Sequence, residues 1–172
     1  MKVSSEGKRA FVAVGSNLGD KVANCRKAIF LVSRHEGVLF KRCSGFYETP
    51  PVGISSNNWF INAVFEVQTT YSPLDFLEML LQVERQMGRD RAAGPDRIID
   101  LDLLDVEGVS RQPDAVSNLE LPHPRFAERD FVLVPWAEIA PDVVPAGYTA
   151  TVGQLLHRLH IDSSSIKKVE DF

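Results

Sequence analysis

The stretch IIDLDLLDV, residues 98–106, alternates apolar and acidic side chains with the two-residue period of a β-strand. Successive side chains of a strand point to opposite faces, so Asp100 and Asp102 share one face, about 6–7 Å apart along the strand. Leu101 and Leu103 point to the other face. We therefore predict a strand that buries one face in a hydrophobic core and presents two carboxylates on the other.

Strand and helix periods recur along the chain before this stretch. Apolar or mixed runs bounded by turn residues predict strands over residues 9–14, 38–47 and 59–69. Helical spacing predicts one helix that begins at residue 21, after a capping Asp20, and stops at residues 35–37. A second helix opens at Ser72 with a proline in its first position and ends at Gly88.

The resulting order is strand, helix, strand, strand, helix, strand, which is typical of the ferredoxin-like fold. We predict an α+β architecture, in which helices cover one face of an antiparallel sheet and helical additions follow at the C-terminal side. These additions are a loop with a short helix over residues 121–130, a helix over 131–139 and a short helix over 152–159. We expect a single domain over residues 1–172, with flexible ends at 1–8 and 161–172.

The composition is that of an ordinary globular protein, with 44% hydrophobic and 24% charged residues. A net charge of -4 argues against a nucleic-acid binder, which usually carries a basic surface. Two cysteines are too few for a disulfide scaffold and are expected to be free thiols. With no signal peptide and no apolar stretch of about eighteen residues, we expect a cytoplasmic protein without membrane contact, and a monomer.

The carboxylate pair Asp100 and Asp102 is the strongest chemical signal. Neighbouring carboxylates repel each other unless a cation lies between them, and Mg²⁺ bound together with substrate phosphates is the usual solution. The alternative is a solvated acidic strand face. Arg89, Arg91 and Arg97 flank a Gly-Pro loop just before the pair. Such guanidinium groups suit the charge of a transferring phosphoryl group, although a solvated basic loop is an equal alternative.

Two further features could contact phosphate. The small-residue turn at 15–20 joins a strand to a helix, whose N-terminus could bind an anion, or it could serve only as a turn. His123 lies between two prolines, followed by Arg125 and Arg129, and could contact phosphate or simply lie on the surface.

Other side chains suit a flat heterocyclic ligand. Asn62 lies among large apolar residues, and its amide offers both an acceptor and donors to a heterocycle edge. The rings of Phe60 and Phe131 could stack on such a ligand or pack in the core. Glu84, late in the second helix, could face the same cleft.

Six stretches, in chain order, resemble the 6-hydroxymethyl-7,8-dihydropterin pyrophosphokinase family of folate biosynthesis. They are VAVGSNLGD (12–20), FYETPPVG (46–53), FINAV (60–64), VERQMGRDR (83–91), GPDRIIDLDLL (94–104) and LPHPRFAERDFVLVPWAEIAP (121–141). Each is modest alone, but six in the same order are not expected by chance.

The resemblance implies a ferredoxin-like fold and an Mg²⁺-dependent transfer of pyrophosphate from ATP to the hydroxymethyl group of the dihydropterin, with release of AMP. It implies two Mg²⁺ ions, bound with ATP by Asp100 and Asp102, and no nucleic-acid partner. Catalytic roles would fall to Arg89, Arg97, Asp100 and Asp102. The pterin side would comprise Thr49, Pro50, Val52, Phe60, Asn62 and Phe131. The ATP side would comprise Glu84, Arg91, Arg97, Ile98, His123 and Arg129.

The chain departs from the family pattern in two places. Residues 92–97 read AAGPDR where the family commonly has R-W-G-P-R, so Asp96 separates Pro95 from Arg97. Phe60 replaces a tyrosine that is common in some members. The altered loop leaves one alternative, a catalytically weakened relative that only binds pterin and nucleotide. The order of strands and helices leaves another, a ferredoxin-like nucleic-acid-binding module, which would need exposed aromatic residues on its central strands.

Overall fold

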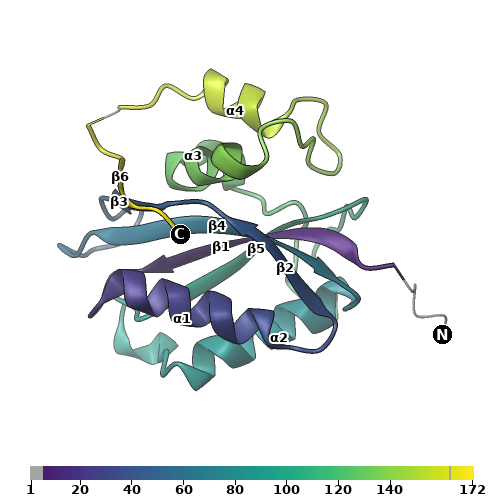
Figure 1. Cartoon of the computed structure of the whole chain (residues 1–172), viewed down its shortest axis with the longest axis horizontal. Helices are drawn as coiled ribbons and strands as arrows, with labels where there is room; N and C mark the ends of the chain where they lie inside the picture. The colour runs from purple at the N-terminus through teal and green to yellow at the C-terminus, as the bar shows by residue number, and fades with distance from the viewer. Residues whose placement is uncertain (1–5, 163) are drawn as a thin grey trace.

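A six-stranded antiparallel sheet forms the centre of the computed structural model, which describes residues 6–162 and 164–172 (Figure 1). The strands are β1 (Lys8–Ser16), β2 (Val38–Cys43), β3 (Phe46–Thr49), β4 (Phe60–Thr69), β5 (Asp100–Val106) and β6 (Lys167–Glu170). Their order is β5-β1-β4-β3-β6, and β2 also pairs with β4. The first and third predicted strands, β1 and β4, therefore lie at the centre, as the ferredoxin-like fold requires.

Two helices cover one face of the sheet, α1 (Lys21–Ser33) and α2 (Pro73–Gln86). Each begins at the predicted cap: an Asp20 carboxylate oxygen accepts from Ala23 N–H at 3.1 Å, and Ser72 Oγ accepts from Asp75 N–H at 3.1 Å. Such caps satisfy amides that lack a partner in the first helical turn.

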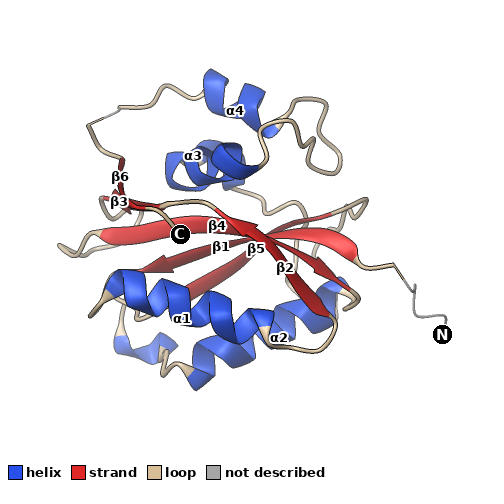
Figure 2. Cartoon of the chain, viewed as in Figure 1, coloured by secondary structure: helices blue, strands red, loops and turns tan. Residues whose placement is uncertain are grey.

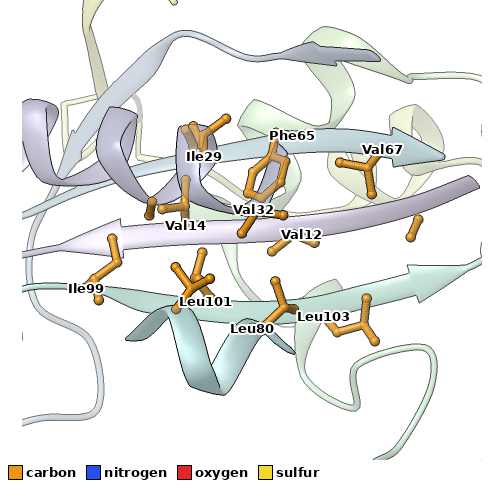
Figure 3. Close-up of a cluster of buried hydrophobic side chains, with 14 of the residues drawn as sticks. Val12, Val14, Ile29, Val32, Phe65, Val67, Leu80, Ile99, Leu101 and Leu103 are labelled. Atoms are coloured by element: carbon orange, nitrogen blue, oxygen red, sulfur yellow. The ribbon is translucent and has the colours of Figure 1, made fainter. Parts of the chain in front are cut away.

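The larger hydrophobic core lies between these helices and the sheet. Its side chains come from alternate strand positions and from the inner helix faces (Figure 3). They include Val12, Val14, Phe65, Leu101 and Leu103 of the strands, and Ile29, Val32 and Leu80 of the helices. The predicted alternation of residues 98–106 is thus confirmed, because Leu101 and Leu103 enter this core and the two aspartates face away from it.

Two more helices, α3 (Asp130–Ile139) and α4 (Val152–Arg158), lie on the opposite side of the sheet (Figure 2). They complete a second core in which Phe11 and Leu104 of the sheet contact Leu133 and Trp136 of α3. Short 3₁₀ helices span Arg91–Ala93 and Phe126–Glu128. The predicted α+β sheet with C-terminal helical additions is confirmed. Within the described ranges, no helix combines the length and apolar character needed to cross a bilayer.

The strand predicted over residues 38–47 is two strands, β2 and β3, both paired with β4. The break falls at Ser44, which is completely buried. Its hydroxyl accepts from Val64 N–H at 3.0 Å and donates to Gly45 O at 2.8 Å, so a side chain replaces part of the ladder.

The C-terminal segment contains an element that the sequence does not predict. Residues 167–170, within the end expected to be flexible, form β6 on the edge of β3. Ion pairs join Lys168 to Glu138 at 2.9 Å and Arg26 to Glu170 at 2.8 Å. At the other end, β1 already begins at Lys8, and residues 1–5 lie outside the described part of the chain. The single-domain organisation stays a prediction.

Candidate active site

A cavity of about 250 Å³ opens between the sheet and the start of α3. It is lined by the end of β1, the end of β3 and the loop that follows it, the starts of β4 and β5, and the first turn of α3. Ten predicted site residues line it: Thr49, Pro50, Val52, Phe60, Asn62, Arg97, Asp100, Asp102, Arg129 and Phe131. The structure therefore brings all six residues of the predicted pterin side together with the carboxylate pair.

Some predicted residues lie outside this lining, and some lining residues are not predicted. The first set is Glu84, Arg89, Arg91, Ile98 and His123. The second set is Ala13, Val14, Gly15, Gly53, Ile54, Arg125 and Val132. Most of the second set are neighbours of predicted residues in the chain or across a strand, so position in the fold rather than residue type brings them to the cavity.

The pairing of strands places the carboxylates of Asp100 and Asp102 near the side-chain amide of Asn62. Gly15 lies opposite Asn62 on one side and opposite Asp100 on the other, while Ala13 lies opposite Asp102. A Cβ atom on Gly15 would come within 2.7 Å of Asn62 Oδ1, so only glycine leaves room for this amide. Asn62 Nδ2 donates to Thr49 Oγ1 at 2.8 Å, which holds the amide across the sheet.

The two aspartates have different surroundings. Asp100 accepts from Arg89 Nη1 at 2.5 Å and lies 3.3 Å from Arg97 Nη2. The carboxylate of Asp102 has no hydrogen-bond donor among the described residues, although Arg129 is close enough to stabilise its charge. Burial, reinforced by the charge of Asp100, raises the pKa of Asp102 to about 7. A buried carboxylate of this kind gains most from a further cation.

The donor chemistry of this pair fits Mg²⁺. Magnesium prefers oxygen ligands and commonly uses one or two carboxylates together with substrate phosphates and water. Within residues 6–162 and 164–172, no group of three or more His, Cys, Asp or Glu side chains is arranged to hold a metal ion. The remaining ligands at Asp100 and Asp102 would therefore come from the nucleotide and from water.

Glu84 is buried behind the carboxylate pair rather than facing the cavity. Its side chain is 2% exposed, with Oε1 2.8 Å from Arg89 Nη1 and Oε2 3.1 Å from Arg91 Nη2. Oε1 also accepts from Leu101 N–H at 2.8 Å, which ties α2 to β5 next to Asp100. Glu84 thus holds Arg89 in position between two carboxylates, and only Arg91 extends toward solvent.

Arg97 connects the two sides of the cavity. Its guanidinium lies over the ring of Phe60, with Cζ 5.1 Å from the ring centroid, as in a cation–π contact. Its Nε is buried without a hydrogen-bond partner among the described residues. The neighbouring Ile98 packs against the larger core instead.

His123 lies beside the cavity on the α3 side of the sheet. The backbone N–H of His123 donates to Leu104 O at 2.8 Å, and its ring Nδ1 accepts from the backbone N–H of Arg125 at 3.2 Å. Burial, together with the charge of Arg129, lowers the pKa of His123 to about 4. The imidazole is therefore neutral near pH 7, and the positive charge in this part of the site comes from Arg125 and Arg129.

The turn at residues 15–20 is held by its own side chains, which favours the structural interpretation of this turn. Asn17 Oδ1 accepts from Arg97 N–H at 2.7 Å, and Asn17 N–H donates to Arg97 O at 3.1 Å. Asp20 caps α1. The turn thereby fixes the backbone of Arg97.

A family model described as 7,8-dihydro-6-hydroxymethylpterin-pyrophosphokinase (HPPK) matches residues 11–141. The chain belongs to this family. Two HPPK relatives named 2-amino-4-hydroxy-6-hydroxymethyldihydropteridine pyrophosphokinase match over nearly their full length. The protein from Methylorubrum extorquens is 41% identical over 94% of this chain and 99% of its own. The protein from Bacillus subtilis is 38% identical over 84% of this chain and 86% of its own.

Solved HPPK-DHPS structures share the fold. A Plasmodium falciparum HPPK-DHPS variant crystallised with pterin and p-hydroxybenzoate gives a TM-score of 0.74 at 14% identity, over 96% of this chain and 48% of that one. An HPPK-DHPS complex with substrates gives a TM-score of 0.69 at 14% identity, over 88% of this chain and 43% of that one. This chain thus spans just under half the length of these solved chains.

Replacing Glu84 with glutamine should destabilise this HPPK family member by about 3 kcal/mol, because Arg89 would keep a buried charge with one partner fewer. The matched control is Glu78→Gln on the same helix, whose exposed pair with Arg85 should contribute less than about 1 kcal/mol. Urea denaturation measures both. Equal losses in the two variants would contradict the role of Glu84.

Replacing Asp102 with asparagine should stabilise the metal-free protein at high pH. Because the pKa of Asp102 rises from 3.8 to about 7 on folding, the folded state binds more protons than the unfolded state between these values. The free energy of unfolding of the wild type therefore falls as pH rises through this window. In EDTA, we expect Asp102→Asn to exceed the wild type by about 4 kcal/mol at pH 8 and by about 2 kcal/mol at pH 5.

Urea denaturation at the two pH values, with the exposed Asp142→Asn as control, measures this difference. A variant that is less stable than the wild type at pH 8, or a gain that is the same at both pH values, would contradict the assigned pKa.

Proposed function

We propose that the cavity binds a dihydropterin and MgATP side by side. The chain transfers a pyrophosphoryl group from ATP to the hydroxymethyl group of 6-hydroxymethyl-7,8-dihydropterin, a step of folate biosynthesis. The observation that carries the assignment of the site is the adjacency of Asn62, Gly15 and Asp100 on three neighbouring strands. It sets a heterocycle-binding amide next to a carboxylate pair suited to a phosphate-bound cation.

The pterin subsite is built from the amide, two rings and a loop. One N–H of Asn62 Nδ2 donates to Thr49 Oγ1, which orients the amide, and its Oδ1 can accept from the N–H groups of a pterin edge. Phe60 and Phe131 reach the same cavity from β4 and α3, where their rings can stack on a flat heterocycle. Residues 49–52 would contribute backbone groups to the remaining polar atoms of the ring.

The nucleotide subsite lies on the side of β5. Asp100 and Asp102 would hold two Mg²⁺ ions, which, when bound, neutralise charge on the ATP phosphates. Arg97 lines the cavity, where its guanidinium can approach a phosphate oxygen. Arg129 lines the cavity, while Arg91 and the neutral His123 lie beyond its wall and are proposed to contact more distant parts of the nucleotide.

The reaction needs alignment more than covalent chemistry. The hydroxymethyl oxygen forms a bond to the β-phosphorus of ATP and loses its proton to water, the bond between that phosphorus and the α,β-bridging oxygen breaks, and AMP leaves with the electron pair. Phosphoryl transfers of this kind are accelerated mainly by positioning and by stabilisation of charge on the phosphate oxygens. Arg97, which lines the cavity beside Asp100, would serve this second purpose, whereas Arg89 is bound between Glu84 and Asp100 and would act by fixing that carboxylate.

The nucleic-acid alternative requires exposed aromatic residues on the central strands. In the structure, Phe11 of β1 and Phe65 of β4 are completely buried, and helices lie on both sides of the sheet. The geometry therefore favours the small-molecule assignment. ATP is made and used in the cytoplasm, so we place the reaction there, and we expect the chain to act as a monomer.

The direct test is AMP release from ATP, measured with and without 6-hydroxymethyl-7,8-dihydropterin at matched Mg²⁺ and with an EDTA control. AMP that forms only when both pterin and Mg²⁺ are present is the expected result. Saturable binding of pterin and nucleotide without AMP would instead identify a catalytically weakened relative. AMP release that continues unchanged in EDTA would contradict the magnesium assignment.

Replacing Asn62 with alanine should raise the dissociation constant for the dihydropterin by about tenfold or more, because pterin donors would be buried without an acceptor. Gln68→Ala is the matched control, since Gln68 lies on the same strand and its side-chain amide donates to Gly7 O at the end away from the cavity. Calorimetric titration of the pterin, in the presence of an unreactive ATP analogue, measures both. Equal affinities for Asn62→Ala and the wild type would refute the role of the amide.

A further inference from the structure

The carboxylate of Asp96 joins three loops around the cavity. Its Oδ1 accepts from Asn17 Nδ2 at 2.8 Å and from the hydroxyl of Ser56. Its Oδ2 accepts from Asn58 Nδ2 at 3.0 Å. These donors come from the turn after β1 and from the loop between β3 and β4, which are 39 or more residues apart from each other in sequence. The carboxylate is thus shared among three segments that are distant in sequence.

Each of these segments carries part of the site. The loop between β3 and β4, residues 50–59, supplies Pro50, Val52, Gly53 and Ile54 to the cavity wall. Gly15 lines the cavity from the end of β1, just before the turn that follows this strand, and Asp96 directly precedes Arg97 in the chain. Asp96 therefore lies where the wall of the pterin subsite meets the backbone of an arginine of the nucleotide subsite.

The two sides of this junction are not held equally. The backbone of Arg97 makes two hydrogen bonds to Asn17 that do not involve the Asp96 carboxylate. Its N–H donates to Asn17 Oδ1 at 2.7 Å, and its carbonyl oxygen accepts from Asn17 N–H at 3.1 Å. The loop over residues 50–59 has no regular secondary structure, and its tip is held to the rest of the site through Ser56 and Asn58. Hydrogen bonds to an ionised carboxylate are stronger than neutral ones, so the loss of Asp96 would release the loop far more than it would release Arg97.

We propose that Asp96 is a positioning residue, which fastens the loop over residues 50–59 to Arg97 and so holds the pterin-binding wall in place before substrate binds. A loop fixed in advance loses less conformational entropy when the ligand arrives. Asp96 acts through the loop and touches neither substrate. This proposal rests on the proposed function, since it assigns the loop to the pterin subsite.

The chain carries its own reporter for this loop. Of its two tryptophans, Trp59 follows Asn58 directly and is 42% exposed, whereas Trp136 is completely buried in the second core. Acrylamide quenching of tryptophan fluorescence therefore reports on the loop and needs no substrate. The matched control is Asp114→Ala, because Asp114 likewise organises a loop by accepting from Val116 and Ser117 N–H, away from the cavity.

The experiment compares Asp96→Ala, the double variant with Ser56→Ala and Asn58→Ala, and the control. We expect stronger acrylamide quenching and a rise of about tenfold in the pterin KM in Asp96→Ala and in the double variant. We expect kcat to stay within about threefold, and the dissociation constant of an unreactive ATP analogue within about twofold, because the Arg97 backbone stays bound to Asn17. Asp114→Ala should match the wild type in every measurement.

Three results would overturn the proposal: quenching equal to that of the wild type, stronger quenching with an unchanged pterin KM, or equal losses of pterin and nucleotide affinity, which would indicate general disruption of the fold. If the wild type itself neither binds pterin nor forms AMP, the proposed function fails. The quenching comparison still decides whether Asp96 holds the loop.

Discussion

The repulsion between Asp100 and Asp102 is the constraint around which the rest of the site is arranged. Two carboxylates on one face of a buried strand cannot both stay ionised without cations nearby. The protein supplies these cations from different directions. Arg89 pairs with Asp100 and is held by the buried Glu84. Arg97 pairs with Asp100 from the loop that precedes β5. The arginines leave part of the negative charge uncompensated, chiefly at Asp102. A phosphate-bound metal ion would compensate this remaining charge.

The fold follows from the sequence to a large extent, because local periodicity and capping carry most of the information. The four predicted strands and two helices appear in the predicted order, and Asp20 and Ser72 cap the helices. The failures have a common physical cause. Ser44 interrupts a strand through side-chain bonds to a distant strand, and β6 pairs through its backbone while its side chains are exposed. Neither contact leaves a periodic pattern in the chain.

For the site, too, local features are predicted from the sequence and contacts between distant residues are not. Residue type and spacing identify the groups that can contact a ligand, such as Asn62 and the carboxylate pair. They do not reveal which way a side chain turns when its neighbours are distant in sequence. Glu84 turns inward to bind arginines and a backbone amide, although the sequence suggests that it faces the cleft. Asp96 is noticed in the sequence only as the residue that separates Pro95 from Arg97, and its three donors become visible only when the loops meet.

The central claim is that Asp100 and Asp102 bind the nucleotide through magnesium. The most direct measurement is calorimetric titration of an unreactive ATP analogue into wild type, Asp100→Asn and Asp102→Asn, each with Mg²⁺ and with EDTA. Mg²⁺ should strengthen binding to the wild type by at least about tenfold, and either substitution should remove most of this gain. Mg²⁺-dependent binding that is equal in all three proteins would contradict this claim.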